Sequence, residues 1–388
     1  MLIPISNVPR DYSWGSTELI PALLGRTPTG GPEAEIWYGD HPGNPSLVTG
    51  GSGQTLDVAL AAAGEQPLPY LLKLLAAGSS LSIQAHPTKA QAEEGFAREE
   101  AAGIARDAAD RLYRDDNHKP EIIVALSDEF HALVGIRELG TTRRLLHVLL
   151  DAQGETGGAL AHLDALLSTE DETAVRNALE WALTEASAAD VAQLTAALDT
   201  ATGDSFAAEV ASLRVAAGDF PGDAGLFVAL LMNLVVLRRG EALFAPAGVL
   251  HAYQSGLGVE LMAASDNVLR GGLTPKHVDV PELLRVLDPA TGPAPLVEPQ
   301  VLEPGVELFA PPVPDFALVR AELEGEGHRI ARRGPAIVLA TVGRVTVASA
   351  GESVLLAPGE AVYVGGADDD LVLTGAGEAF VAQPGAPI

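Results

Sequence analysis

A helical segment of about 100 residues in the middle of the chain separates two regions made of short strands. Between about Leu139 and Arg239, apolar residues recur at a spacing of three and four, as in Leu145, Leu146 and Leu149. This is the period of an amphipathic helix. On both sides, short apolar runs alternate with Gly, Pro and Ser, which is typical of strands joined by tight turns. We therefore expect a mainly β fold with a helical insertion.

The boundaries of these regions predict three domains. Residues 1–138 together with 238–300 are expected to form one β domain, residues 139–237 an all-α insertion, and residues 301–388 a second β domain. Within the insertion, Ser168 precedes Asp171 by three residues, which predicts a capping box. The apolar segment Leu226 to Leu237 is interpreted as a buried helix, too short to cross a membrane.

Charge and cysteine content exclude several classes of partner and site. Asp and Glu total 52 against 24 Lys and Arg, a net charge of −28, and such a surface repels nucleic acid and anionic membranes. The chain has no cysteine, which excludes disulfides and thiolate metal sites. The first residues do not resemble a signal peptide. We expect a cytoplasmic monomer or weak homo-oligomer.

Three separate segments carry residues with metal-binding chemistry. Gln84 and His86 are two apart in SIQAHPTK, Glu121 begins the apolar run EIIVAL, and His251 follows the turn in FAPAGVLHAY. Taken singly, these segments have ordinary explanations: Gln84 and His86 could lie beside a turn, Glu121 could be a solvated carboxylate, and His251 could be a histidine of the core. Together they supply two imidazoles, a carboxylate and an amide oxygen, a set that suits one zinc ion, with manganese and iron as alternatives.

A fourth segment, GVELMAASDNVLRGGLTPKHVDV, concentrates charged residues around a Gly-Gly pair. Arg270 and Lys276 have the chemistry that binds phosphate, Arg through its planar fork and Lys as a point charge. Glu260 and Asp266 lie in the same stretch. The alternative interpretation is a group of surface ion pairs.

These segments resemble the type I mannose-6-phosphate isomerases (phosphomannose isomerases). The matching motifs occur in the family's order from residue 11 to residue 280: YSWGS, AEIWYGDHP, LLKLLAAGSSLSIQAHPTK, DDNHKPEIIVAL, GVLHAY and GVELMAASDNVLRGGLTPKHVDV. The resemblance implies two cupin-like jelly rolls with a helical domain. It also implies that Gln84, His86, Glu121 and His251 bind zinc and that Arg270 is the active-site arginine.

The resemblance further places a group of residues in or near a sugar-phosphate pocket. Those expected to line it are Lys73, Ser82, Lys119, Glu260 and Lys276, with His118, Tyr253 and Asp266 close by.

The implied reaction interconverts mannose 6-phosphate and fructose 6-phosphate through a cis-enediol. Its hard step removes a weakly acidic C–H proton, so zinc and Arg270 are expected to stabilise the charge on oxygen. Glu260, Lys119 and His118 are the candidates for moving the proton. Lys73 and Lys276, with the Ser82 hydroxyl, are expected to bind phosphate.

Two other functions are consistent with parts of this pattern. One is a cupin metalloenzyme that acts on unphosphorylated sugars or as an oxygenase, although an oxygenase usually has two histidines and one carboxylate without a fourth ligand such as Gln84. The other is a non-catalytic sugar-binding cupin. The C-terminal domain contains one histidine, His328, and we expect a structural role for it.

Overall fold

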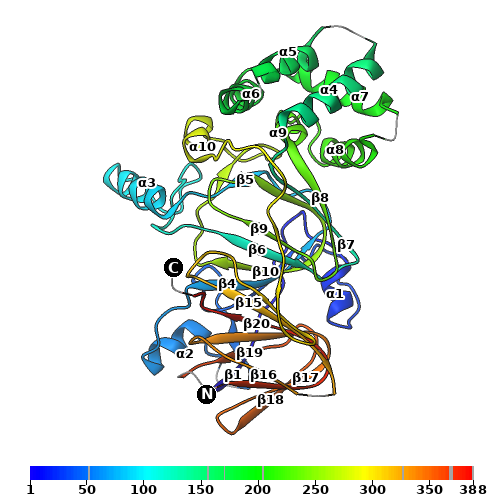
Figure 1. The fold of residues 1–388 in the computed structure, drawn as a ribbon. Coiled ribbons are helices and arrows are strands. Elements are labelled where there is room, and N and C mark those ends of the chain that lie inside the picture. Colours follow the sequence, from blue (N-terminus) through cyan, green and yellow to red (C-terminus); the bar gives the residue numbers. More distant parts are fainter. Residues whose placement is uncertain are drawn as a thin grey trace.

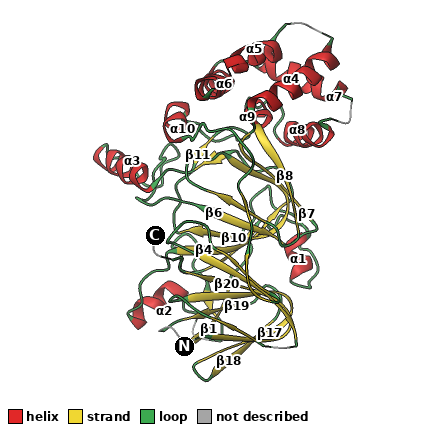
Figure 2. Ribbon diagram, viewed as in Figure 1, coloured by secondary structure: helices red, strands yellow, loops and turns green. Residues whose placement is uncertain are grey.

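The computed structural model describes residues 1–50, 53–154, 157–169, 171–202, 205–325, 327–366 and 370–386. Figure 1 shows three parts along one axis, with a group of helices at one end and two sheets below it. Figure 2 shows that strands dominate the lower two parts. The prediction of a mainly β fold with a helical insertion is confirmed.

The middle sheet contains the strands that later form the site. Its central path runs β11 (Leu269–Arg270), β5 (Gln84–Ala85), β10 (His251–Ala263), β6 (Glu121–Ala125), β9 (Ala242–Ala245) and β12 (Leu296–Val297). Four further strands extend it: β2 (Glu35–Tyr38), β4 (Tyr70–Ala77), β7 (Glu129–Ile136) and β8 (Met232–Arg238).

The long strand β10 connects two halves of this sheet. Its first residues pair with β5 and β7, and its last eight pair with β4, from Gly256 to Ala263. The change of partner follows a bulge between Tyr253 and Ser255. Gly256 has φ +120, and a Cβ there would lie 2.7 Å from the Phe130 ring, so the crossing requires glycine. One strand therefore carries both His251 and Glu260.

The helical insertion packs as a bundle on the end of this sheet. It comprises α4 (Leu139–Gln153), α5 (Ala159–Leu166), η1 (Leu167–Thr169), α6 (Glu172–Thr184), α7 (Ala188–Thr200), α8 (Ala207–Asp219) and α9 (Gly225–Leu231). Its buried leucines share one core with Ile83 and Leu250, which lie beside the predicted metal ligands in sequence. The insertion is therefore continuous with the region around the site.

Two local predictions for the insertion are wrong. The apolar run from Leu226 is helical only to Leu231 and continues as strand β8, which pairs with β7; a short fully buried run has no period that separates helix from strand. Helix α6 is capped by Asp171, whose carboxylate accepts from Ala174 N at 2.8 Å. Ser168 instead donates to Ala165 O, because it lies in the preceding 3₁₀ turn.

The second sheet consists mainly of C-terminal strands: β13 (Gln300–Glu303), β14 (Val306–Phe309), β15 (Ala317–Glu324), β16 (His328–Ile330), β17 (Ala336–Ser349), β18 (Glu352–Leu356), β19 (Ala361–Val364) and β20 (Leu371–Gln383). The first strand of the chain, β1 (Leu2–Ser6), pairs with β19, and β3 (Leu47–Val48) pairs with β1. The N-terminal residues thus add to the C-terminal sheet.

The two sheets share an apolar core. Leu72 and Leu74 of the middle sheet belong to the same apolar cluster as Leu318 and Phe380 of the other. The C-terminal sheet therefore supports the back of the sheet that carries the site.

Outside the insertion, the described residues form four further helices: α1 (Leu19–Leu23), α2 (Leu56–Ala63), α3 (Lys89–Ala101) and α10 (Val280–Val286).

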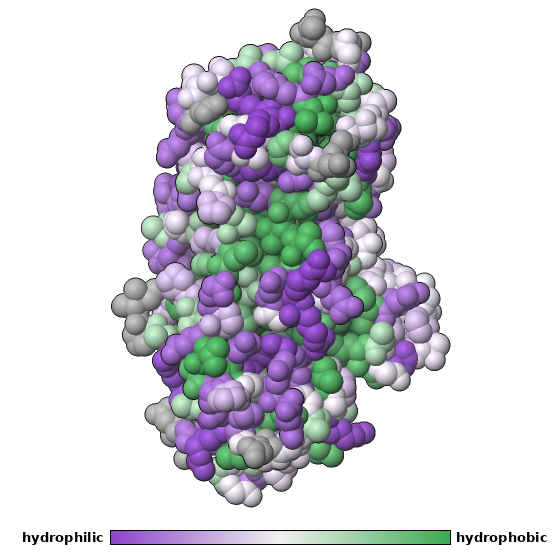
Figure 3. Space-filling view, turned by 45° about the vertical axis from the view of Figure 1, so that its right-hand side comes forward, coloured by the Kyte–Doolittle hydropathy of each residue, from purple (hydrophilic) through white to green (hydrophobic). Residues whose placement is uncertain are grey.

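Polar residues cover much of the face drawn in Figure 3, with apolar patches between them. Across the described residues, no helix is both long and apolar enough to span a bilayer.

Candidate metal centre and active-site cavity

Short strand pairings bring the predicted metal-binding segments together. His251, the first residue of β10, lies directly opposite Gln84 of β5, and Arg270 of β11 lies opposite Gln84 on its other side. Glu121 is the first residue of β6 and pairs with Met262 of β10. Pro120 precedes this strand, where its missing N–H costs no ladder bond.

His86, Glu121 and His251 form a compact buried group. His86 Nε2 lies 3.3 Å from Glu121 Oε1, and His251 Nε2 lies 3.2 Å from Glu121 Oε2. The two histidines are fully buried and Glu121 is 2% exposed. One potential ligand atom from each of the three residues falls within 4.8 Å of the others.

The hydrogen bonds of the two histidines direct their Nε2 atoms toward this centre. His86 Nδ1 lies 2.7 Å from the carbonyl oxygen of Asn267, and His251 Nδ1 lies 3.0 Å from that of Val249. Each Nδ1 therefore donates a proton, which leaves Nε2 as an acceptor. Both Nε2 atoms and Glu121 Oε2 are buried and make no hydrogen bond with the described residues. A divalent cation fits this donor set.

The ionisation of these groups also suits a cation. Burial lowers the pKa of His86 to about 4, so its imidazole is neutral at pH 7. Burial would raise the pKa of Glu121, but Lys119 and the two histidines outweigh it and hold the pKa well below its usual value. Lys119 Nζ lies 3.0 Å from Glu121 Oε1. The centre thus offers an anionic carboxylate at Glu121 and a neutral imidazole at His86.

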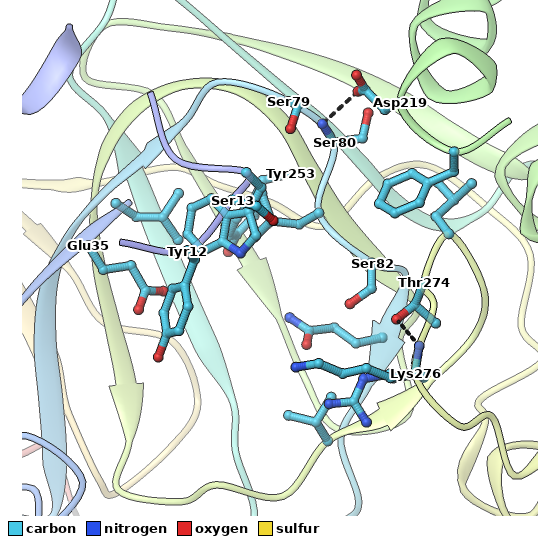
Figure 4. Close-up of a pocket in the computed structure, with 18 of the residues that line it drawn as sticks. Tyr12, Ser13, Glu35, Ser79, Ser80, Ser82, Asp219, Tyr253, Thr274 and Lys276 are labelled. Carbon is cyan, nitrogen blue, oxygen red and sulfur yellow. Dashed lines mark hydrogen bonds between the residues drawn. The ribbon is translucent and has the colours of Figure 1, made fainter. Parts of the chain in front are cut away.

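A cavity of about 610 Å³ opens beside this group. Gln84 and Glu121 line it, whereas His86 and His251 lie buried behind the lining. Figure 4 shows Tyr12, Glu35 and Tyr253 on one side of the cavity and Ser82, Thr274 and Lys276 on the other. Its volume suits a small polar ligand.

The first side of the cavity contains a buried chain of alternating charges. Lys73 Nζ lies 3.0 Å from Glu260 Oε2 and 3.6 Å from Glu35 Oε1. Trp37 Nε1 donates to Glu35 Oε2 at 2.7 Å. Burial lowers the pKa of Lys73, but the two carboxylates outweigh it and raise the pKa above its usual value. Burial also raises the pKa of the Glu260 carboxyl group above its usual value.

The opposite side is cationic. Arg270 and Lys276 line the cavity and make no ion pair with a carboxylate among the described residues. Burial lowers the pKa of Arg270, and nearby Arg114 lowers it further. Burial and the charges of Arg270 and Arg114 likewise lower the pKa of Lys276. These two cations, which no carboxylate among the described residues neutralises, form a ready site for a dianion.

Comparisons with known proteins agree with this geometry. Residues 2–139 match a family model described as phosphomannose isomerase type I, catalytic domain. The mannose-6-phosphate isomerase of Escherichia coli (strain K12) is 35% identical over 386 residues, covering 96% of each chain. This chain belongs to the type I phosphomannose isomerase family.

A solved structure of the family has the same fold throughout. The mannose 6-phosphate isomerase from Salmonella typhimurium, bound to fructose 6-phosphate and zinc, superposes with a TM-score of 0.88 at 34% identity. The match covers 99% of this chain and 100% of the other. The Salmonella typhimurium relative is 36% identical in sequence over 96% of each chain.

Most of the residues predicted for the site line the cavity: Lys73, Ser82, Gln84, Lys119, Glu121, Tyr253, Glu260, Arg270 and Lys276. Two predicted neighbours do not. His118 Nε2 lies 2.8 Å from Asp315 Oδ2, so its ring is directed to a loop that precedes β15. Asp266 lies 3.6 Å from His41 and is largely exposed. Both belong to segments that flank the site in sequence, but their side chains contact other partners.

Several lining residues were not singled out from the sequence. Three of them, Tyr12, Trp14 and Glu35, belong to the motifs YSWGS and AEIWYGDHP, so the resemblance of these motifs to the family could have identified them. Asp219 and Phe220 come from the end of α8. Nothing in the helical pattern marks them, because only the packing of the insertion brings them to the cavity.

Proposed function

We propose that this chain is a zinc-dependent aldose–ketose isomerase that interconverts mannose 6-phosphate and fructose 6-phosphate. The observation that carries the proposal is the pairing of two features in one cavity. The Nε2 atoms of His86 and His251, which no described residue hydrogen-bonds, converge with Glu121 at one point. On the wall beside them, Arg270 and Lys276 have no carboxylate partner within the described part of the chain. The relative that binds fructose 6-phosphate and zinc supports the same assignment.

We assign zinc to His86, Glu121 and His251, with Gln84 as the fourth ligand, one ion per chain. Gln84 lines the cavity and faces His251 across the strand pairing. Bound zinc supplies a Lewis acid that stabilises negative charge on the sugar oxygens. The absence of cysteine agrees with this nitrogen and oxygen set.

Glu260 is our choice for moving the proton between C2 and C1. Burial raises its pKa, which brings the carboxyl group nearer to neutral pH, where proton transfer is most effective. Lys119 and Arg270 line the same cavity and can stabilise charge on the enediolate oxygens. His118 is the weakest of the sequence candidates because its ring contacts Asp315.

We place the phosphate group at Lys276, with Ser82 as a hydroxyl donor. These side chains share one side of the cavity, as Figure 4 shows for Ser82 and Lys276. Lys73, predicted from sequence to bind phosphate, has its charge engaged by Glu260 and Glu35. It fits better as the group that holds the Glu260 carboxylate in position. For Asp266 and Tyr253 we propose positions near the bound substrate.

The chain's other expected properties follow from its charge and layout. A net charge of −28 opposes binding to nucleic acid or anionic membranes. We propose a cytoplasmic enzyme that acts as a monomer or weak homo-oligomer on a sugar phosphate. We also propose three domains. The first combines residues 1–138 with 238–300, the second is residues 139–237, and the third is residues 301–388, to which strand β1 is joined by its pairing with β19.

An isomerase assay on purified protein tests the function. Turnover of fructose 6-phosphate and mannose 6-phosphate should be abolished by a chelator and restored by zinc. Unphosphorylated mannose should turn over at least about 100-fold less well, because the cationic wall then lacks its anion. Equal turnover of mannose would favour the unphosphorylated-sugar alternative, and no turnover of any sugar would favour a binding protein.

A further inference from the structure

The connection between α8 and α9 contacts two walls of the active-site cavity. Asp219, at the end of α8, accepts a hydrogen bond from Ser80 N at 2.7 Å, as Figure 4 shows. Four residues later, Asp223 Oδ1 accepts from Gly225 N at 2.7 Å and from Leu273 N at 3.1 Å, and its Oδ2 accepts from Thr274 N at 2.9 Å. The helical insertion therefore holds the turn that leads to Lys276.

This turn has a costly backbone conformation. Leu273 has φ +50, and among the described residues Ala350 is the only other non-glycine residue with a positive φ. A residue with a side chain is strained in this left-handed region unless its surroundings hold it. Leu273 is fully buried, and its N–H is one of the groups bound by Asp223.

Close packing fixes the turn against α9. A Cβ added at Gly225 would lie 2.3 Å from Leu273 N, and one added at Gly272, where φ is +112, would lie 2.4 Å from Gly225 Cα. The two backbones therefore touch at Gly225 and Gly272. The contact places the Asp223 carboxylate directly at the backbone N–H groups of Leu273 and Thr274.

The turn, held by its hydrogen bonds to Asp223, orients Lys276 toward two other cations. Thr274 Oγ1, next to the bonds made by Asp223, accepts from Lys276 N at 3.2 Å. The Lys276 ammonium lies near Arg270 and Arg114, and their repulsion acts to move it away. Holding three like charges together requires a rigid backbone, and the N–H groups of Leu273 and Thr274 are held by Asp223.

We infer that Asp223 is a positioning residue that places Lys276 in the phosphate site, so that the helical insertion takes part in substrate binding. This inference rests on the proposed function. Asp223 itself is not among the residues that line the cavity, and backbone N–H groups occupy both of its oxygens. A direct contact between this carboxylate and phosphate would be repulsive, so its effect passes through the turn.

Steady-state kinetics of Asp223→Asn and Asp223→Ala test the inference, with inorganic phosphate as a probe of the phosphate site. We expect KM for mannose 6-phosphate and the inhibition constant of phosphate to rise together, by about tenfold for the alanine variant and less for the asparagine variant, which keeps one acceptor oxygen. kcat should change less than about threefold, and zinc content should not change.

A matched control separates positioning from general stability. Asp171 caps α6 in the same insertion; Asp171→Ala should lower the melting temperature without changing KM or phosphate inhibition. Lys276→Met should raise KM, and the double variant Asp223→Ala/Lys276→Met should be no worse than Lys276→Met alone. A folded, zinc-loaded Asp223→Asn with unchanged KM and phosphate inhibition, or additive effects in the double variant, would overturn the inference. Failure of the wild-type enzyme to turn over mannose 6-phosphate would instead overturn the proposed function.

Discussion

Lys73 and Glu260 face each other across the pairing of β4 with β10, and Lys73 Nζ lies 3.0 Å from Glu260 Oε2. Both side chains are buried, and Lys73 also lies 3.6 Å from Glu35. The lysine therefore neutralises two buried carboxylates. Removing one member of such a group leaves the others charged and unpaired, which is far more costly than losing a surface pair.

Replacing Lys73 with methionine should destabilise the protein strongly. We expect a loss of about 3–5 kcal/mol of unfolding free energy, because Glu260 and Glu35 then remain buried without a cation. Urea unfolding at pH 7 measures this loss. Lys89→Met is the matched control: Lys89 is exposed, lies 3.9 Å from Glu93 and 3.8 Å from Asp116, and should cost no more than about 1 kcal/mol. Similar losses for the two variants would contradict the buried-charge interpretation.

Replacing His251 with alanine should remove zinc and activity together. His251 provides one of the buried Nε2 atoms that no described residue satisfies, and loss of one ligand of a catalytic site greatly weakens metal binding. Metal analysis of the purified variant should find well under one zinc per chain. His328→Ala, a histidine of the C-terminal sheet paired with Glu303, should keep full zinc and activity. A His251→Ala variant that stays active without zinc would refute the ligand assignment.

Sequence reasoning identified the parts of the fold and site that depend on local pattern. The long strands His251–Ala263 and Ala336–Ser349 follow apolar runs bounded by turn residues. The group His86, Glu121 and His251 came from residue chemistry and motif order, and the strands bring it together as expected. The Gly-Gly pair after Arg270 stands out in the sequence, but its packing of Gly272 against Gly225 of α9 is visible only in the structure.

The remaining features depend on tertiary packing that no local pattern encodes. The pairing of β1 with β19 joins residues more than 350 positions apart, as Ile5 with Ala361. Asp223 occupies an ordinary polar position between two helices, and its importance emerges only when α9 meets Gly272. Likewise, Lys73 resembles a free phosphate-binding lysine in sequence until the strand register places Glu260 opposite it.

Replacing Arg270 with alanine should slow turnover without loss of metal. Arg270 lines the cavity and lies opposite Gln84 in the strand pairing, beside the metal group but not within it. Loss of one preorganised positive group at developing charge typically costs about 10²–10³ in kcat. Assays paired with zinc analysis should show this fall at full zinc content. Arg329→Ala, an exposed arginine paired with Asp370, serves as control. Unchanged kcat in Arg270→Ala would remove arginine from the chemistry.

Replacing Glu282 with glutamine should reduce stability at neutral pH and have a smaller effect in acid. Burial raises the pKa of Glu282, but hydrogen bonds from Arg285, Tyr113 and Arg98 outweigh it and lower the pKa to about 2, against an ordinary value of 4.5. A carboxyl group whose pKa is lower in the folded protein contributes stability above its unfolded pKa. That contribution is lost as pH falls from about 4.5 toward 2.

The difference in urea midpoint between wild type and Glu282→Gln, measured from pH 7 to pH 3, tests this expectation. The wild type should be clearly more stable at pH 7. The difference should shrink as pH falls below about 4.5, because the unfolded wild-type chain then binds a proton at Glu282 that the folded chain does not bind until about pH 2. Glu93→Gln, an exposed residue 3.9 Å from Lys89, should differ little from wild type at any pH. A Glu282→Gln difference that stays constant down to pH 3 would show that the network stabilises α10 by packing, because a charge effect must titrate.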